Sequence, residues 1–349
     1  MKADFTEKLL EWNVACNDRQ MPWKGEQDLY RIWISEIILQ QTRVEQGLAY
    51  YQRFINNFPD VHALAQASDE HVFKIWEGLG YYSRCKNLLH TARHIASELD
   101  GKFPNNYEQI LKLKGIGPYT ASAIASFAFG EKCAVVDGNV QRVLSRYFGI
   151  STPVDSKSGK HLFDEIAQSL IPHDQPGKYN QAIMDFGATV CRPRNPLCVS
   201  CIQQPDCQAY RHDNVHKLPV KEKKASRRSR WLNYFIVRCD GYVYIRKRKG
   251  ADIWQNLHEF LLFETDKEWN EPINHYIEVV LPNSSYQLVH TAIPRPQQLS
   301  HQTIHGKFFV IDLAEPAKIG SDYMLVEKSN LNQYAFPRLI TSFLHEYAV

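Results

Sequence analysis

The stretch LKLKGIGPYTA, residues 111–121, determines which fold the N-terminal part of this chain can adopt. Apolar residues recur at helical spacing on both sides of it, and Gly115 and Gly117 indicate a tight turn between two helices. Pro118 suits the first position of the second helix, because a helix does not use the N–H that proline lacks there. The two glycines also let backbone N–H groups approach a phosphate at the positive end of that helix. A plain corner between two helices is the alternative, and the turn alone does not separate the two.

Helical periodicity continues on both sides of this hairpin, and no segment before residue 210 alternates as a strand. After residues 211–229 the pattern changes to runs rich in β-branched and aromatic residues, and Asp240-Gly241 predicts a hairpin between the first two. We therefore expect a multidomain chain with an all-α domain over residues 1–210, a basic linker over 211–229 and an α+β domain over 230–349. The expected helical segments are 30–58, 69–76, 87–99, 140–148 and 331–347, and the expected strands are 231–238, 242–248, 260–264, 286–292 and 307–313.

Composition excludes several classes of protein. The chain has 349 residues, 44% of them hydrophobic, and a net charge of +3, so it can build cores and is not strongly basic overall. It has no apolar run of about 18 residues and no signal-peptide pattern, so we expect a cytoplasmic protein, nucleoid-associated if bacterial, with reduced cysteines. Residues 217–230 carry seven basic residues against one acid, which predicts either a DNA contact or a solvated spacer.

Four cysteines, Cys191, Cys198, Cys201 and Cys207, form a C-x6-C-x2-C-x5-C pattern. This close spacing lets four thiolates converge on one metal centre. Zinc sites usually pair two C-x2-C units across a longer spacer, and only one such unit occurs here. The pattern therefore favours an iron–sulfur cubane and leaves zinc open.

The hairpin is followed about twenty residues later by VVDGNV, residues 135–140, and then by the four cysteines. This combination resembles the endonuclease III superfamily of DNA glycosylases. Within it, SEIILQQT at residues 35–42 and GLGYY at residues 78–82 resemble the MutY family of adenine glycosylases. The resemblance covers essentially the whole chain. It implies a helix–hairpin–helix glycosylase domain, a [4Fe–4S] cluster on the four cysteines, and a monomer acting on double-stranded DNA with A:8-oxoguanine or A:G mispairs.

The resemblance also implies the roles of two carboxylates. Glu36 would protonate adenine as a general acid and then activate water as a base, and its apolar neighbours should raise its pKa. Asp137 would face the oxocarbenium-like sugar as an electrostatic stabiliser or a transient nucleophile, as a second carboxylate does in glycoside hydrolysis, and Asn139 would help to hold the water or the carboxylate. Asp137 also suits the N-cap of a helix that begins near Gly138, and both roles are compatible.

Tyr119 stands at the hairpin position where bifunctional relatives carry a lysine that forms a Schiff base with the sugar. Tyrosine cannot form that bond. The resemblance therefore implies a monofunctional enzyme that removes the base with little intrinsic strand cleavage.

A base inside a duplex must be flipped out before it can react. Gln41 and Tyr81 resemble the family residues that wedge into the base stack, with Thr42 and Arg43 beside Gln41 in the DNA-binding set. Taken singly, Gln41 would be polar helix surface and Tyr81 a core aromatic residue. The resemblance also assigns the hairpin glycines Gly115 and Gly117 to the DNA backbone, and the adenine pocket to Arg19, Trp23 and Gln181.

Residues 230–349 resemble the Nudix-like domain of the same family, with a partial match at IWQNLHEF, residues 253–260. No glutamate-rich R-E-x-x-E-E box follows, so we expect a binding module without metal-dependent pyrophosphate cleavage. Leu299, Ser300 and His301 stand where the family carries a Phe-Ser-His loop that reads the oxidised guanine. A polar hairpin loop without that role is the alternative.

Three other functions compete with an adenine DNA glycosylase of base-excision repair. Tyr119 and the long C-terminal domain disfavour a pyrimidine-specific glycosylase and lyase like endonuclease III. Glu36 and Asp137 disfavour a non-catalytic iron–sulfur damage sensor, because a binder would not need two carboxylates near phosphate. The missing acidic box disfavours a Nudix hydrolase with an added helical domain.

Overall fold

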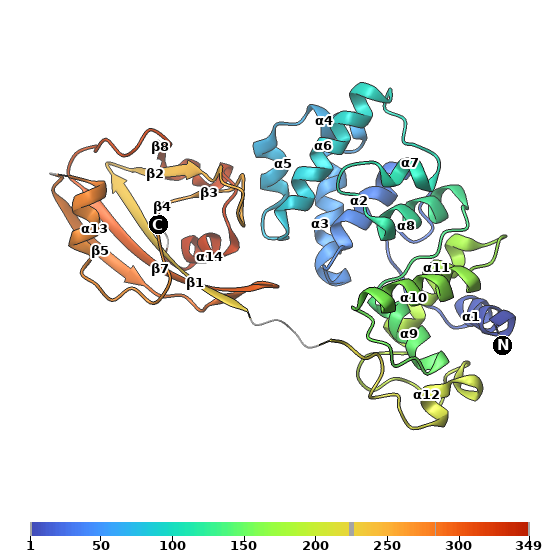
Figure 1. Cartoon of the computed structure of the whole chain (residues 1–349). Helices are drawn as coiled ribbons and strands as arrows, with labels where there is room; N and C mark the ends of the chain where they lie inside the picture. Colours follow the sequence, from blue (N-terminus) through green and yellow to red (C-terminus); the bar gives the residue numbers. More distant parts are fainter. Residues whose placement is uncertain (1, 223–226, 283, 348–349) are drawn as a thin grey trace. The chain divides into compact units, whose positions relative to one another are not determined.

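The computed structural model describes residues 2–222, 227–282 and 284–347 (Figure 1). The chain separates into two compact units, one made of residues 1–66 and 86–224 and the other of residues 67–85 and 225–349. Residues 223–226 of the expected basic linker lie outside the described residues. The expected boundary within residues 211–229 stays a prediction.

The described residues up to 222 form helices and no strand, as the periodicity predicts. The helix that contains the end of the hairpin motif, α8, begins at Pro118 and has Gly117 as its N-cap. The helices are α1 (Lys2–Ala15), α2 (Leu29–Leu39), α3 (Val44–Asn57), α4 (Val61–Gln66), α5 (Asp69–Trp76), α6 (Tyr82–Glu98), α7 (Tyr107–Leu111), α8 (Pro118–Phe129), α9 (Gly138–Phe148), α10 (Lys157–Leu170), α11 (Pro176–Thr189) and α12 (Gln208–Arg211), with a 3₁₀ turn at Gln204–Asp206.

The segment 30–58 is interrupted between α2 and α3. Gln41 has a left-handed backbone with φ of 55°, and the N–H of Thr42 donates to the carbonyl of Leu39 at 3.1 Å. A non-glycine residue in this region is uncommon because its Cβ crowds the backbone. The break therefore presents residues 40–43 as a short exposed corner at the end of α2.

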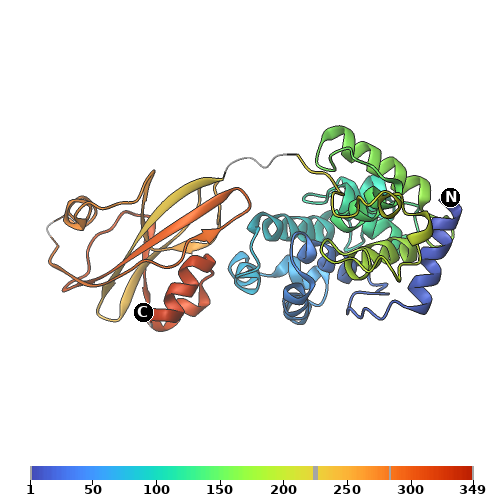
Figure 2. The same cartoon turned by 90° about the horizontal axis from the view of Figure 1, so that it is seen from below.

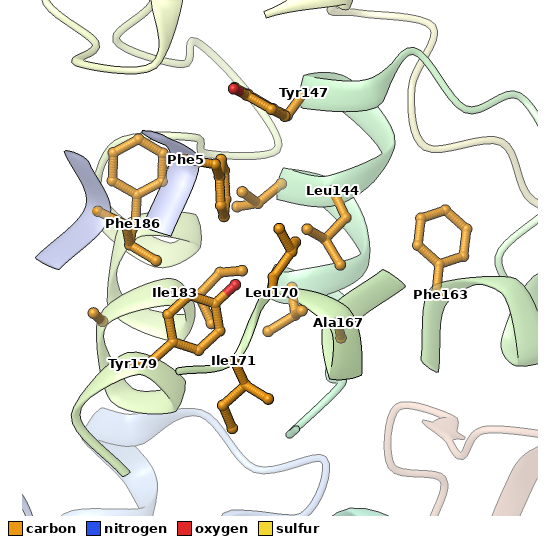
Figure 3. Close-up of a cluster of buried hydrophobic side chains, with 14 of the residues drawn as sticks. Phe5, Leu144, Tyr147, Phe163, Ala167, Leu170, Ile171, Tyr179, Ile183 and Phe186 are labelled. Atoms are coloured by element: carbon orange, nitrogen blue, oxygen red, sulfur yellow. The ribbon is translucent and has the colours of Figure 1, made fainter. Parts of the chain in front are cut away.

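One hydrophobic core joins α1, α9, α10 and α11 (Figure 3). Phe5, Leu144 and Phe163 are fully buried in it, so truncating Leu144 to alanine would cost about 2–5 kcal/mol of stability. The backbones of α9 and α11 approach closely at Gly187, where an added Cβ would lie 2.7 Å from the Cβ of Asn139. This packing fixes the N-terminal end of α9 against α11.

The second unit is built on a mixed sheet of eight strands in which β1 and β7 pair in parallel and the other pairings are antiparallel. The main order is β3-β2-β1-β7-β5, with β4 on β1, β6 on β7 and β8 on β2. The strands are β1 (Arg228–Cys239), β2 (Tyr242–Lys247), β3 (His258–Glu259), β4 (Leu261–Thr265), β5 (Tyr286–Ala292), β6 (Gln297–Gln298), β7 (Gln302–Leu313) and β8 (Tyr323–Glu327).

A helix covers each face of this sheet, and Figure 2 shows both. Tyr276 of α13 (Ile273–Val280) stacks on Phe235 with ring centres 4.7 Å apart. Phe343 of α14 (Arg338–Tyr347) stacks at 4.2 Å on Phe308, which points to the opposite face because it pairs with the residue before Phe235. The predicted helix 331–347 is wrong in its first part: a 3₁₀ turn spans Lys328–Gln333, and α14 begins only after Pro337.

No helix among the described residues is both long enough and apolar enough to cross a membrane.

Candidate active site

Glu36 lies on α2 and is buried, with 7% of its surface exposed. The pKa of its carboxyl is raised to about 7: burial raises it most, the hydroxyl of Tyr119 lowers it, and the charge of Asp137 raises it. A carboxyl with a pKa near neutrality is half protonated at neutral pH. The structure thus gives Glu36 the protonation state that a general acid needs.

Asp137 is the N-cap of α9. One of its carboxylate oxygens accepts hydrogen bonds from the backbone N–H groups of Asn139 and Val140 at 2.8 and 2.7 Å. The other accepts from the side-chain amide of Asn139 at 2.8 Å. Burial raises the pKa of Asp137 on balance, while these hydrogen bonds lower it. The expected N-cap is confirmed, and the three donors hold the carboxylate in one orientation.

Tyr119 follows the hairpin as the second residue of α8 and is close to both carboxyl groups. Its hydroxyl donates to the sulfur of Met184 at 3.6 Å, and its pKa is well above the ordinary value because of burial and the nearby Glu36 and Asp137. The hydroxyl therefore stays neutral. Three residues from three helices, α2, α8 and α9, meet at this point.

Two buried arginines extend the hydrogen bonds around Asp137 towards the first cysteine. The sequence offers no reason to select them. Arg142 donates to the side-chain oxygen of Asn139 at 2.9 Å and to the carbonyl of Cys191 at 2.8 Å. Arg146 donates to the sulfur of Cys191 at 3.4 Å and to the carbonyl of Arg192 at 2.8 Å. A continuous chain of polar contacts thus runs from the Asp137 carboxylate to the first cysteine.

The expected pocket residues lie on the N-terminal loop and α11. Arg19 donates to Asp185 at 2.8 Å, and Asp185 is completely buried, so it is a functional candidate that the sequence analysis missed. Trp23 is buried and meets the ring of Tyr51 edge-on at 5.5 Å. Gln181 precedes Asp185 by one helical turn, so the two side chains share one face of α11.

The two hairpin glycines differ in backbone conformation and in the space around them. Gly115 has φ of 80°, and a Cβ there would lie 2.5 Å from the Cβ of Asn87, so no other residue fits. Gly117 has an ordinary φ of −94°, and a Cβ there would meet nothing within 4 Å. The open space at Gly117, at the N-terminus of α8, is where an anion can reach the backbone N–H groups.

Gln41 and Tyr81 share an unusual conformation. Both are exposed and both have positive φ, 55° for Gln41 and 48° for Tyr81. Gln41 therefore does not lie on the surface of a helix, and Tyr81 is not a core aromatic residue, so the simple alternative is wrong for each of them. Strained residues cluster at functional sites, so the observation supports selection of these two positions. Thr42 is half-buried and Arg43, the N-cap position of α3, is exposed.

Leu299, Ser300 and His301 form the tip of the β6–β7 hairpin, closed by a hydrogen bond from the N–H of Leu299 to the carbonyl of Gln302 at 2.8 Å. Ser300 and His301 are exposed. Within the second unit, the hydroxyl of Tyr81 lies 2.5 Å from that of Ser300. The structure therefore brings one wedge candidate to the expected reader loop.

Cys191, Cys198, Cys201 and Cys207 line one pocket with Arg146 and Leu197. Among the described residues, no group of three or more side chains stands in ready metal-binding geometry. Burial raises the pKa of Cys201 to about 12, so that thiol would lose its proton only to a metal or another strong positive charge. The convergence of four sulfurs and the guanidinium donor on Cys191 both fit a thiolate-held cluster.

Both parts of the chain resemble known proteins. Residues 34–168 match the HhH-GPD superfamily of base excision DNA repair proteins, and residues 233–346 match the NUDIX domain family. An adenine DNA glycosylase of Buchnera aphidicola is 36% identical over 75% of this chain and 75% of its own length. The human adenine DNA glycosylase is 42% identical over 59% of this chain and 39% of its own length.

Solved structures agree for the helical part. A thermostable thymine-DNA glycosylase is 30% identical, with a TM-score of 0.56, over 60% of this chain and 97% of its own. A non-covalent endonuclease III–DNA complex shares the fold at 19% identity, with a TM-score of 0.52, over 61% of this chain and 98% of its own.

The glycine hairpin and the pair of nearby carboxyl groups, with the matches above, define a helix–hairpin–helix DNA glycosylase of base-excision repair. The C-terminal sheet is that of the Nudix-like domain. With both parts in one chain, and with this similarity to the Buchnera protein, the chain belongs to the adenine DNA glycosylase family, whose members act on N-glycosyl bonds.

Proposed function

We propose that this protein removes adenine paired with 8-oxoguanine or guanine in double-stranded DNA, and that it does so without cleaving the strand itself. The observation that carries the proposal is the meeting of the buried Glu36 with the half-buried Tyr119 and Asp137, with the pKa of Glu36 near 7. The family assignment supports adenine as the base.

In the proposed reaction, Glu36 donates its proton to a ring nitrogen of the flipped adenine. The glycosidic bond then breaks with its electron pair moving to the base, and positive charge develops on the sugar. The Asp137 carboxylate faces that charge, held by Asn139. Water next adds to the sugar carbon and gives its proton to the Glu36 carboxylate, which restores the starting state.

Tyr119 supports a monofunctional reaction, because a neutral phenol provides no amine for a Schiff base. The tyrosine would instead hold Glu36 in place through its hydroxyl. Arg19, Trp23 and Gln181 are proposed to line the adenine pocket, with the buried Asp185 fixing the guanidinium of Arg19.

Four residues are proposed to hold a [4Fe–4S] cluster: Cys191, Cys198, Cys201 and Cys207. When bound, the cluster would cross-link the loop 191–207 and keep its thiolates charged. Arg146 would donate to the Cys191 thiolate, and Arg142 would connect the same loop to Asn139. In this role the cluster supports the position of Asp137.

The tip Leu299–Ser300–His301 is proposed to recognise the base opposite adenine. Leucine lacks the aromatic face of the family's phenylalanine, but Ser300 and His301 keep exposed hydrogen-bonding groups. Gln41 and Tyr81 would enter the stack, and Gly115 and Gly117 would hold the backbone. The monomeric state and the cytoplasmic location remain predictions from the sequence.

The deciding experiment measures base release from duplexes with A:8-oxoguanine, A:G, A:T and thymine glycol, with and without alkaline treatment. Strand breaks only after alkali, and only opposite 8-oxoguanine and guanine, are expected. Cleavage at thymine glycol, or breaks without alkali, would contradict the proposal. A variant with Ser300→Ala and His301→Ala should lose more activity on A:8-oxoguanine than on A:G, and equal losses would contradict the reader role.

A further inference from the structure

The start of β1 lies directly beside the reader tip. The strands β1 and β7 pair in parallel, with Arg228 opposite Gln302 and Ser229 opposite Thr303. The N–H of Arg228 donates to the carbonyl of His301 at 3.2 Å. The chain entering the second unit therefore places two arginines, Arg227 and Arg228, next to a tip that is far away in sequence.

Arg227 precedes the first residue of β1, and its side-chain contact places it on the side of the sheet opposite to Arg228. The guanidinium of Arg227 donates to the side chain of Gln298 at 3.0 Å. Gln298 pairs with Thr303, and Thr303 with Ser229, so Arg227 lies on the face of Ser229 and Trp231. Arg228 lies on the other face.

The surroundings of Arg227 and Arg228 differ in charge. On the side of Arg227, Trp231 stacks on His305 with ring centres 4.7 Å apart. The paired strand residues nearest the tip on this side carry hydroxyl, amide and aromatic side chains but no carboxylate. Arg228, by contrast, lines a groove with five carboxylates, at Asp252, Glu264, Asp266, Glu268 and Glu271, and Arg227 is not among the residues that line it. Acidic neighbours therefore offset the field of Arg228, whereas none of these five carboxylates lines a groove with Arg227.

Most basic groups of this sheet are already paired with acids. The ion pairs include Arg230 with Asp252 and Glu264, Arg238 with Asp312, and Arg246 and Arg248 with Glu259. Arg227 is exposed and takes part in no ion pair among the residues that the structure describes. An unpaired guanidinium beside an aromatic surface is typical of residues that hold a nucleic-acid strand.

We propose that Arg227, with the stacked pair Trp231 and His305, binds the backbone of the DNA strand that carries the lesion, next to the base read by the tip. The inference rests on the proposed reader function of Leu299–Ser300–His301. A tip that contacts one base edge must lie between phosphates of the same strand, and contacts to phosphate fix the register of a reader without reading sequence. Arg227 is the positioning residue for that register.

The experiment measures the dissociation constant between about 50 and 200 mM salt, for the full-length holoprotein and a duplex that holds an abasic-site analogue opposite 8-oxoguanine. Each phosphate contact contributes about 0.9 to the slope of log affinity against log salt. Arg227→Ala should lower the slope by about one. Between the two salt concentrations, the affinity of this variant should therefore fall by a factor roughly three- to fourfold smaller than that of the wild type. Arg227→Lys should keep the wild-type slope, because it retains the charge.

Two variants are matched controls. Arg228→Ala removes the neighbouring charge that lines the acidic groove, and Lys318→Ala removes an exposed charge beyond the far end of β7. Both should keep the wild-type slope. An unchanged slope in Arg227→Ala would overturn the proposal, and so would equal losses in Arg227→Ala and Arg228→Ala, because binding would then depend on linker charge in general.

Duplexes with 8-oxoguanine or with guanine opposite the abasic-site analogue distinguish a failure of this inference from a failure of the proposed function. Arg227→Ala should weaken binding equally opposite 8-oxoguanine and guanine, since a phosphate contact carries no base information. A wild-type protein that released no adenine from A:8-oxoguanine would refute the proposed function, whatever the slopes. A selective loss opposite 8-oxoguanine alone would make Arg227 part of the reader and would contradict a backbone role.

Discussion

Replacing Glu36 with glutamine should stabilise the protein while abolishing its proposed activity. The pKa of Glu36 is about 7 in the folded protein against an ordinary value of 4.5. At about 1.36 kcal/mol per pKa unit, ionising this buried group costs the folded state about 3 kcal/mol. Glutamine has the same shape and never ionises, so Glu36→Gln removes that cost.

The sign of the effect depends on pH. The folded protein binds the Glu36 proton more tightly than the unfolded chain, so this group lowers the stability as pH rises from about 4.5 to about 7. The advantage of Glu36→Gln should therefore be about 3 kcal/mol at pH 8 and under about 1 kcal/mol at pH 5. For a unit of this size, the difference at pH 8 corresponds to about 6–12 °C in Tm.

The assay is a thermal unfolding series of the holoprotein from pH 5 to pH 8, for the wild type, Glu36→Gln and Glu45→Gln. Glu45 is an exposed carboxylate in the first turn of α3, so its replacement should cost up to about 1 kcal/mol through the helix dipole and should give no Tm gain that grows with pH. Release of adenine from A:8-oxoguanine is measured in parallel and should fall by at least about 100-fold in Glu36→Gln. A Tm gain that does not grow with pH, or a loss at pH 8, would refute the reasoning.

Three further outcomes are expected. Tyr119→Phe removes a hydroxyl that lowers the pKa of Glu36, so the alkaline limb of the single-turnover pH–rate profile should move to higher pH, and an unmoved limb would contradict the contact. Gly115→Ala should destabilise the protein by more than about 1 kcal/mol, because its Cβ would clash and φ is positive, whereas Gly117→Ala should keep Tm but weaken DNA binding. Cys198→Ser should lower the iron content of the purified protein and its visible absorbance, and a full complement of iron would contradict a four-cysteine cluster.

The sequence predicted the parts of the fold that local chemistry controls. The hairpin between α7 and α8 and the strand over residues 286–292 appear where they were expected, because glycine turns and alternation leave local patterns. The break at Gln41 was not predictable, since nothing in a polar glutamine signals positive φ. The helix expected over residues 331–347 is wrong in its first part, because Pro337 does not fit inside a helix and α14 begins only after it.

The site was predictable only where a motif carries it. The sequence selected Glu36 and Asp137, and the structure brings them together. Asp185 was missed because its partner Arg19 is 166 residues away, and Arg142 was missed for a similar reason. One signal was available for Asp185: an acid between apolar neighbours on a helix must be paired if it is buried.

The parallel pairing of β1 and β7 has a consequence for synthesis. Partners in this pair stand 74 residues apart, as in the contact between Arg238 and Asp312. All residues proposed for bond cleavage, and the four cysteines, leave the ribosome before the first strand of the sheet does. The reader tip acquires its neighbours only when β7 is complete, near the end of translation. In the proposed function, selectivity would therefore be the last property that the growing chain acquires, and a chain that stops before residue 299 would carry the residues proposed for bond cleavage without the reader tip.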